Sequence, residues 1–347
     1  MTDLDFAVPH DLEADAPPAQ RDAIRLLVAQ PDGMTHASFA DIGAHLRAGD
    51  LLVVNTSATL AAAVDGILVA RGGPADVTDH FATELDDASW VVEVRPQRNA
   101  AGPLEGVAPG DRLHLPDGVR LMITEPYPAG QARLWRARIA VEGGVVSYLA
   151  RVGRPIRYSY VPTAHPIEQY QTVFARAVNP ELPGGSAEMP SAGRPFTDAI
   201  VTDLVTRGVS VAPIVLHTGV SSQGPGEPPQ PERFSVPEAT ARLVNLTRAW
   251  GNRVIAVGTT VTRALESAAD SQGVVQARKG WTDLVLGEHR PARVVGGLVT
   301  GWHEPGASHL DLLRAVAGEE LVEAAYTEAL RERYRWHEFG DSCLLLP

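Results

Sequence analysis

Two histidines in the sequence are candidates for acid–base chemistry. His217 directly follows the apolar run 209–216, and His303 lies three residues after Thr300. An imidazole whose pKa lies near ~6.5 can take or give a proton at neutral pH. We therefore predict that His217 and His303 are the catalytic residues. The alternative for either one is a structural histidine at the end of a strand.

Other polar side chains also follow apolar runs that have the character of buried strands. Asn55 ends the run 51–54, and the turn Gly258-Thr259-Thr260 ends the run 253–257. In α/β folds, ligands bind in the crevice beyond the carboxyl ends of the strands. A strand–turn–helix junction also presents backbone amides to an anion. The alternative for Thr259 or Thr260 is an ordinary helix N-cap.

The commonest catalytic signatures do not occur in the sequence. There is no phosphate-binding G-x-x-x-x-G-K loop, no G-x-G-x-x-G after a strand, no G-x-S-x-G elbow and no H-E-x-x-H helix. His303-Glu304-Pro305 cannot form a zinc-binding helix, because proline interrupts it and no second histidine follows at the required spacing. The absence of these motifs removes the commonest routes to a kinase, a Rossmann dehydrogenase, a serine hydrolase or a zincin.

The elements that would position these residues follow a strand–helix alternation. Ser235 and Glu238 predict a capping box that opens a helix, and Gly251 predicts its end. The apolar runs 51–54, 209–216 and 253–257 predict buried strands, whereas 41–47, 197–207, 264–269 and 319–333 predict helices.

The residue pattern of the chain changes from about residue 66. Short β-type runs alternate there with Gly, Pro and Asp turns, which is typical of a small antiparallel barrel or sandwich. The runs are 90–94, 112–115, 119–124 and 132–139. We predict an inserted all-β domain over 66–149, within an α/β catalytic domain formed by 1–65 and 150–347.

The composition suits a globular protein that stays in the cytoplasm. The 347 residues are 44% hydrophobic, and Cys343 is the single cysteine. The first 28 residues lack the basic and apolar regions of a signal peptide, and no run approaches the ~20 apolar residues of a membrane span. The net charge of −12 argues against broad nucleic-acid binding but leaves room for a local basic patch.

In addition, ordered blocks along nearly the whole chain resemble the S-adenosylmethionine:tRNA ribosyltransferase-isomerase family of queuosine biosynthesis. The most specific block is Val254-Ile-Ala-Val-Gly-Thr-Thr260, followed by Arg263 and Leu265-Glu-Ser-Ala268. The other blocks are Arg21–Val28, Gly49–Asn55, Tyr170–Phe174, Gly185–Gly193 with Phe196-Thr197, Leu216-His217-x-Gly219, Thr300 with His303 and Pro305, Glu332–Arg335, and Phe339–Asp341.

The resemblance implies a larger, barrel-like α/β domain with an inserted small β-barrel. It also implies transfer of the ribosyl part of S-adenosylmethionine, a co-substrate, to a 7-aminomethyl-7-deazaguanine base of tRNA. The ribosyl group is isomerised to an epoxycyclopentanediol, while adenine and methionine leave. The resemblance also implies that no metal is required. The substrate-binding residues that it implies are Asn55, Tyr170, Gln171, Thr172, Ser191, Gly193, Thr197, Gly219, Thr259, Thr260 and Arg263.

The chain also departs from the family pattern. An aspartate and two arginines of the family block that begins at Asn55 are Thr56, Ala58 and Ala63 here, and a family histidine is Pro195. The loss of cationic groups weakens contacts to phosphate. Two alternatives therefore stand beside the tRNA reaction. One is a paralogue that uses S-adenosylmethionine with a small-molecule substrate, and the other is a non-catalytic binding protein.

Overall fold

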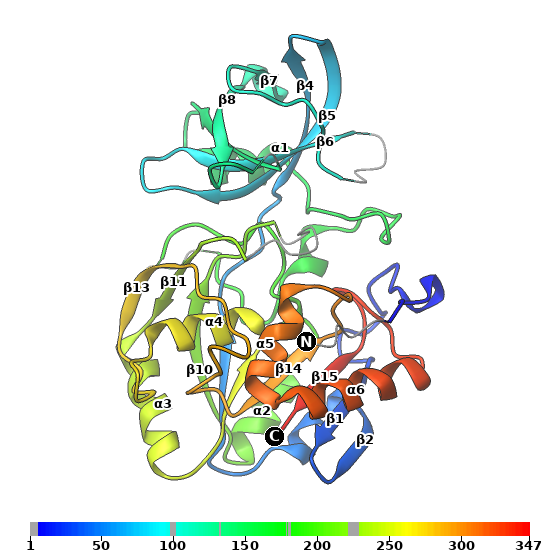
Figure 1. Ribbon diagram of the computed structural model, residues 1–347, viewed down its shortest axis with the longest axis vertical. Helices are drawn as coiled ribbons and strands as arrows, with labels where there is room; N and C mark the ends of the chain where they lie inside the picture. The colour runs from blue at the N-terminus through cyan, green and yellow to red at the C-terminus, as the bar shows by residue number, and fades with distance from the viewer. Residues whose placement is uncertain (1–5, 98–101, 132, 178, 180–181, 221–228) are drawn as a thin grey trace.

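The computed structural model describes residues 6–97, 102–131, 133–177, 179, 182–220 and 229–347. Its larger part is a mixed sheet with helices on both faces, and its smaller part is a β-barrel at one end of the molecule (Figure 1). The larger sheet runs, in order, through β13 (Arg278–Thr282), β11 (Glu232–Val236), β10 (Ser210–Leu216), β3 (Leu51–Asn55), β12 (Val254–Val257), β14 (Gly297–Gly301), β15 (Ser342–Leu345), β1 (Arg25–Gln30) and β2 (Gly33–Ser38).

The centre of the larger sheet is parallel. Strands β10, β3, β12 and β14 pair side by side in one direction, so their carboxyl ends lie at one edge. Strand β15 pairs antiparallel with β14, and β11 pairs antiparallel with β10. This direction of pairing brings Asn55, Leu216, Val257 and Gly301, the last residues of the four parallel strands, to the same side of the molecule.

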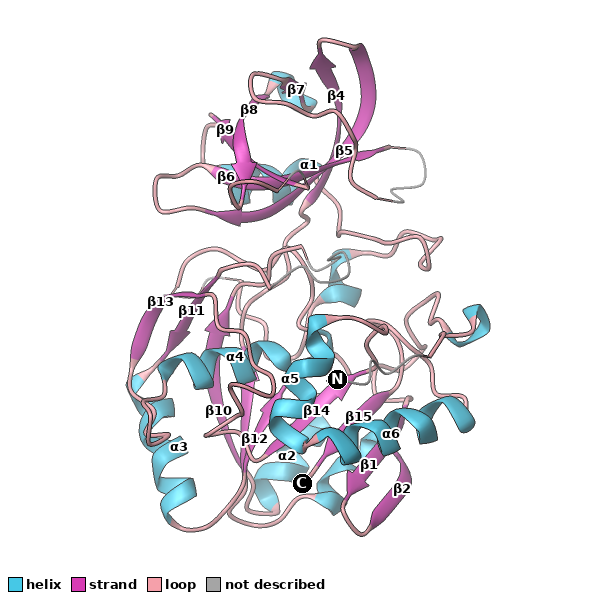
Figure 2. Ribbon diagram, viewed as in Figure 1, coloured by secondary structure: helices cyan, strands magenta, loops and turns pink. Residues whose placement is uncertain are grey.

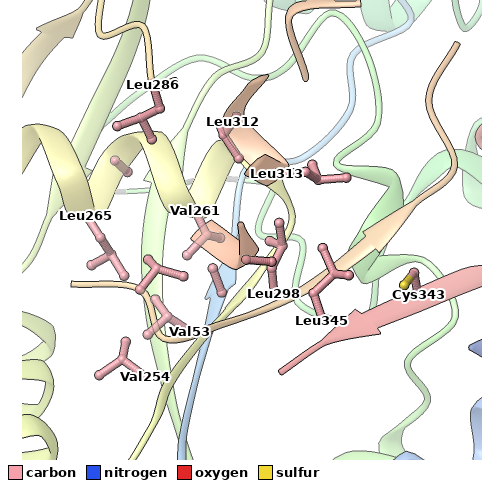
Figure 3. Packing of buried hydrophobic residues seen from close by; sticks show 14 of the residues in the cluster. Val53, Val254, Val261, Leu265, Leu286, Leu298, Leu312, Leu313, Cys343 and Leu345 are labelled. Carbon is pink, nitrogen blue, oxygen red and sulfur yellow. The ribbon is translucent and has the colours of Figure 1, made fainter. Parts of the chain in front are cut away.

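The central strands are apolar on both faces because helices cover both. Leu51 and Val53 of β3 face one core, whereas Leu52 and Val54 face the other, as the two-residue repeat of a strand requires. The first core packs against α3 (Glu238–Ala249), α4 (Thr259–Ala268), α5 (Ser308–Ala317) and α6 (Glu319–Arg331). Figure 3 shows part of it, with Val261 and Leu265 of α4 beside residues of the sheet.

The second core lies on the opposite face of the sheet. It is covered by the 3₁₀ helix η2 (Phe39–His45) and by α2 (Asp198–Thr206). The ring of Phe39 meets Phe196 edge-on, with their centroids 5.0 Å apart. The sheet is therefore the middle layer of three, as Figure 2 shows.

Six strands form the closed barrel. Their order is β4 (Ala63–Ala70), β5 (Gly73–Glu84), β6 (Trp90–Pro96), β9 (Leu134–Ile139), β8 (Arg120–Tyr127) and β7 (Arg112–His114). Inward-facing side chains such as Phe81, Trp90 and Leu113 form a core of their own, against which α1 (Val145–Val152) packs. The chain leaves the larger sheet after β3, forms the barrel, and returns to the sheet at β10.

The predicted α/β class with an inserted small β-barrel is confirmed. The larger sheet is open in the described chain, with β13 and β2 at its edges, so only the smaller sheet closes into a barrel. The division into 1–65, 66–149 and 150–347 stays a prediction. The predicted capping box is wrong, because Ser235 pairs within β11 and the N-cap of α3 is Pro237, which provides no side-chain cap.

Candidate functional site

The site lies where the parallel strands end and face the barrel. A cavity of about 1040 Å³ is lined there by residues that follow β3, β10, β12 and β14. The barrel contributes Arg95, Arg133 and Trp135 to the opposite wall. A cavity of this size at the carboxyl ends of parallel strands is the usual place for a ligand in an α/β fold.

The cavity wall that follows β12 is the amino-terminal end of α4. Gly258, the N-cap, has φ 95°, a conformation that a residue with a side chain rarely adopts. A Cβ there would also lie 3.3 Å from Cβ of Ala192. Thr259 and Thr260 are the first two residues of the helix and both line the cavity. Neither is therefore the N-cap, the alternative considered from the sequence.

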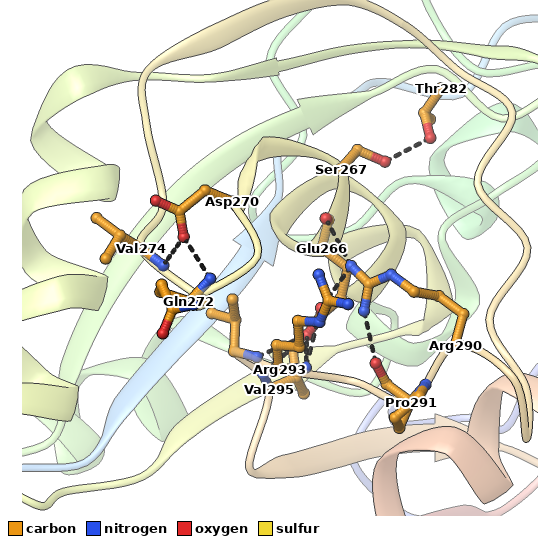
Figure 4. Close-up of polar contacts among 12 residues, drawn as sticks. Glu266, Ser267, Asp270, Gln272, Val274, Thr282, Arg290, Pro291, Arg293 and Val295 are labelled. Atoms are coloured by element: carbon orange, nitrogen blue, oxygen red, sulfur yellow. Dashed lines mark hydrogen bonds and ion pairs between the residues drawn. The ribbon is translucent and has the colours of Figure 1, made fainter.

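A buried carboxylate fixes the other end of α4. Glu266 accepts hydrogen bonds from the backbone amides of Arg293 (2.9 Å), Val294 (2.8 Å) and Val295 (3.2 Å), just before β14 begins. Figure 4 shows this cluster, with Arg290 reaching the same residue. Helix α4 is thus tied to the loop that leads into β14, which sets the position of Thr259 and Thr260 relative to His303.

His303 lies in the cavity wall beside a second histidine, His309. Their rings are stacked, with centroids 4.5 Å apart and planes 2° from parallel. Nε2 of His303 lies 3.0 Å from Oγ1 of Thr300, and its backbone amide donates to the hydroxyl of Tyr326. Burial, followed by the neighbouring His309, holds the pKa of His303 well below its usual value, and burial lowers the pKa of His309 to about 4. Both rings are therefore neutral at pH 7.

His217 is placed differently, since it does not line the cavity. Its Nε2 lies 3.2 Å from the carbonyl oxygen of Leu182, and its Nδ1 lies 2.7 Å from Oγ of Ser57. A carbonyl oxygen only accepts, so Nε2 donates and Nδ1 accepts from Ser57. Burial lowers the pKa of His217 to about 4. Protein groups thus occupy both nitrogens of this neutral ring.

A chain of hydrogen bonds still connects His217 with the cavity wall. The backbone amide of Ser57 donates to Oδ1 of Asn55 at 3.0 Å, and Nδ2 of Asn55 donates to Oγ1 of Thr260 at 3.4 Å. Nearby, the side-chain amide of Gln171 bonds both backbone groups of Thr59, a cavity-lining residue. Asn55 and Gln171 therefore lie behind the wall and hold it in place.

The other predicted substrate-binding residues divide in the same way. Tyr170, Ser191, Gly219 and Arg263 line the cavity together with Thr259 and Thr260, whereas Asn55, Gln171, Thr172, Gly193 and Thr197 are outside the lining. Thr197 is the N-cap of α2, where its hydroxyl accepts from the amide of Ile200. Thr172 is buried against Gly193, where an added Cβ would lie 3.3 Å from the threonine methyl.

Arg263 lines the cavity and stabilises its wall through contacts with other protein groups. Its guanidinium pairs with Glu232 and donates to the backbone carbonyls of Gln230 (3.1 Å), Thr282 (3.3 Å) and Leu284 (3.2 Å). Burial raises the pKa of Glu232, and the arginine opposes that shift. This pairing joins α4 to β11 and β13, and it commits the arginine's donors to protein partners.

Two tyrosine–glutamate pairs also line the cavity and were not predicted. The hydroxyl of Tyr160 donates to Glu338 at 2.6 Å, and that of Tyr158 donates to Glu188. The ring of Tyr160 stacks on His337 at 3.8 Å. These residues come from segments without helical or strand periodicity, so no pattern placed them together. Two features of the sequence could have indicated these residues: the Tyr-x-Tyr spacing of Tyr158 and Tyr160, and the six-residue interval from His303 to His309.

The buried side-chain atoms of the lining that have no hydrogen-bond partner in the described part of the protein include one donor and one acceptor of neutral side chains. These two are Nε1 of Trp302 and Oε1 of Gln230. Buried polar atoms are normally paired, so a bound molecule would complete them. The described residues contain no group of three potential metal ligands, and none of their helices could cross a membrane. The expected absence of a metal stays a prediction.

Comparisons with known proteins agree with the resemblance seen in the sequence. A family model described as "Queuosine biosynthesis protein" matches residues 1–345. The chain is 34% identical to the S-adenosylmethionine:tRNA ribosyltransferase-isomerases of Symbiobacterium thermophilum and Syntrophotalea carbinolica, over 100% of this chain and 99% of each relative. It is also similar to the crystal structure of the S-adenosylmethionine tRNA ribosyltransferase of Thermotoga maritima, with 27% identity, a TM-score of 0.53 and 99% of both chains covered.

Proposed function

Because the chain belongs to the queuosine biosynthesis protein family, we propose that it is an S-adenosylmethionine:tRNA ribosyltransferase-isomerase. It would transfer the ribosyl part of S-adenosylmethionine to a 7-aminomethyl-7-deazaguanine base in tRNA and isomerise it, releasing adenine and methionine. The observation that carries this proposal is the cavity between barrel and sheet, where a neutral histidine and several carboxylates face one space. Since tRNA is cytoplasmic, the cytoplasmic location expected from the sequence belongs to the same proposal.

The charges of the cavity suit a sulfonium cation. Its three arginines already have acidic partners, since Arg95 and Arg133 pair with Glu93 at 2.7 and 3.1 Å and Arg263 pairs with Glu232. The glutamates of the lining are Glu105, Glu188, Glu232, Glu304 and Glu338. This excess of carboxylates favours a positively charged ligand, because opposite charges attract more strongly where water is excluded.

His303 is the proposed base. Oγ1 of Thr300 donates to the carbonyl of Gly301 at 3.1 Å, which leaves it to accept from Nε2 of His303. Nδ1 then carries the lone pair. The sulfonium makes the neighbouring 5′ protons of the ribose acidic, so Nδ1 can remove one and start the opening of the ring. His217, with both nitrogens occupied, is proposed to position Ser57 and Asn55.

The remaining groups of the lining would hold the two leaving groups. The amino-terminal end of α4 presents backbone amides and the hydroxyls of Thr259 and Thr260, which suit the carboxylate of methionine. Trp302 Nε1 and Gln230 Oε1 supply an unused donor and an unused acceptor, as an adenine edge requires. Adenine leaves more easily when its nitrogens accept hydrogen bonds, and His309 lines the same cavity.

Two of the three departures in the block that begins at Asn55 lie at buried positions, the aspartate position Thr56 and the arginine position Ala63. Thr56 is 7% exposed, and its hydroxyl donates to the carbonyl of Ile214 at 3.0 Å. Ala63 is 2% exposed in β4. Charged groups at these two positions would lie inside this protein, so their loss does not by itself argue against tRNA.

Adenine release tests the proposal. The protein is incubated with S-adenosylmethionine, with and without tRNA that carries the deazaguanine base, and free adenine is measured by liquid chromatography. The proposal predicts adenine only when the modified tRNA is present. Adenine without tRNA would instead support the small-molecule paralogue, and its absence in every mixture would support a non-catalytic binding protein.

A further inference from the structure

The outer face of the barrel carries arginines that have no acidic partner. Arg112 of β7, Arg120 of β8 and Arg138 of β9 are exposed, and none forms an ion pair within the described chain. This is unusual here, because the chain has a net charge of −12 and most of the arginines that line its cavity or join its helices are paired. The three arginines are therefore available to a ligand from outside.

The strand register places these arginines on one continuous surface. Val69 lies opposite Arg112, Arg112 opposite Met122, and Met122 opposite Arg138. A second row contains Ile67, His114 and Arg120. Because side chains directly opposite each other point to the same side of a sheet, all seven share one face. We call this set (Ile67, Val69, Arg112, His114, Arg120, Met122 and Arg138) the barrel face.

The apolar members of the barrel face are exposed, as its arginines are. Ile67, Val69 and Met122 are 45%, 44% and 38% exposed. Apolar side chains gathered on a surface mark a place of interaction. In Figure 1, β4, β7 and β8 lie at the end of the barrel that is farthest from the large sheet. The face is therefore separate from the cavity and free of its lining.

Few carboxylates compete for the arginines of the barrel face. Asp65 and Glu125, farther along β4 and β8, already pair with Arg154 at 2.6 Å and with Arg136 at 2.9 Å. Asp76 of β5 lies opposite Ile67 of β4 and is the acidic residue at the edge of the barrel face. Arg112 and Arg138 flank Met122 and are two strand spacings, or roughly 10 Å, apart. Guanidinium groups spread in this way can contact successive phosphates of one backbone.

From this geometry we propose that the barrel face binds the phosphodiester backbone of the tRNA substrate, outside the cavity in which its base reacts. This inference rests on the proposed function, because it takes tRNA as the partner. The arginines contact phosphates, while Val69 and Met122 pack against the sugars between them. The interaction is electrostatic and does not depend on base sequence.

Binding of fluorescein-labelled tRNA to the full-length protein tests the proposal. The triple variant Arg112→Gln/Arg120→Gln/Arg138→Gln should raise the Kd at least ~10-fold, and it should reduce the slope of log Kd against log salt by about 2–3. The matched control Arg207→Gln/Arg242→Gln/Arg331→Gln removes the same charge from exposed positions, at the C-cap of α2 and within α3 and α6. It should change the Kd less than about twofold.

Replacing the same three arginines with lysine should preserve the salt slope, since lysine retains the positive charge. Thermal unfolding of each variant checks that the barrel is intact. A wild-type Kd and slope in the barrel-face variant, or an equal loss in the control, would overturn the proposal. The binding measurement needs no turnover. If the wild-type protein binds tRNA through this face but releases no adenine, the proposed function fails while the barrel face stands.

Discussion

His303 and His309 lie face to face in the cavity wall, with ring centroids 4.5 Å apart and planes 2° from parallel. The stacking fixes the orientation of His303, and its Nε2 is held by Thr300. The edge that carries Nδ1 is thereby set by two contacts. A base held in this way can remove a proton from a ligand without first reorienting.

The first prediction concerns this base. His303→Ala should lower the rate of adenine release by ~10²-fold or more, because general-base catalysis contributes about that factor. His289→Ala, in an exposed loop, is the matched control and should retain the wild-type rate. Thermal unfolding of both variants separates lost chemistry from lost folding. An unchanged rate in His303→Ala would remove the assignment.

The second prediction concerns the recognition of a cation. Glu338→Gln should weaken S-adenosylmethionine binding by roughly 10-fold, measured by calorimetry, because a carboxylate of the cavity lining is lost while Tyr160 keeps an acceptor. S-adenosylhomocysteine is the matched ligand, since it lacks only the methyl group on sulfur and, with it, the positive charge. Its affinity should change little. Equal losses of affinity for both ligands would show that Glu338 does not recognise the positive charge of the sulfonium.

The third prediction concerns pH and His217. The pKa of this ring is about 4 in the folded protein and near ~6.5 in the unfolded chain. Above pH 6.5 both states are neutral, so the ring has no effect on the pH dependence of stability. As pH falls from 6.5 to 4, only the unfolded chain takes up the proton, and the free energy of unfolding should fall by on the order of 3 kcal/mol.

His217→Asn should remove that share of the pH dependence, because asparagine does not titrate. His309 contributes a similar share and remains in the variant. Urea unfolding of both proteins at pH 7 and at pH 4.5 measures the difference. Parallel losses of stability in the two proteins would show that His217 is protonated in the folded state as readily as in the unfolded one.

The fourth prediction concerns the ion pair between Arg263 and Glu232, whose side chains are 8% and 12% exposed. Arg263→Met leaves a buried carboxylate without its partner and should lower the free energy of unfolding by about 3–5 kcal/mol. Combining it with Glu232→Gln should recover much of that loss. Arg242→Met, which breaks the exposed pair with Glu238, is the control and should have little effect. No recovery in the double variant would contradict the account of this pair.

The sequence predicts the strand ends better than the cavity as a whole. The runs before Asn55, His217 and Gly258 become β3, β10 and β12, because a continuous apolar run in a parallel sheet is buried on both faces. The sequence does not reveal that β11 continues through Ser235, since strand pairing with β13 overrides the local capping pattern. It also misses β1 and β15, which pair across more than 300 residues.

The cavity illustrates the same limit more sharply. Tyr158, Tyr160, Glu188 and Glu338 meet in the cavity wall although they come from three loops that are far apart in the sequence. Three of the four lie outside helices and strands in stretches without periodicity, and the fourth follows α6 in the carboxyl-terminal loop. Residue type alone likewise did not distinguish His303, in the cavity wall, from His217, whose nitrogens bind protein groups.

The central claim is that the ribosyl group of S-adenosylmethionine reaches tRNA from this cavity. The most direct measurement uses S-adenosylmethionine labelled with ¹³C in the ribose and tRNA that carries the deazaguanine base, followed by mass spectrometry of the digested tRNA. We predict that the five labelled carbons appear in one modified nucleoside, with one adenine released for each nucleoside formed. Release of adenine without any label in the tRNA would contradict the account.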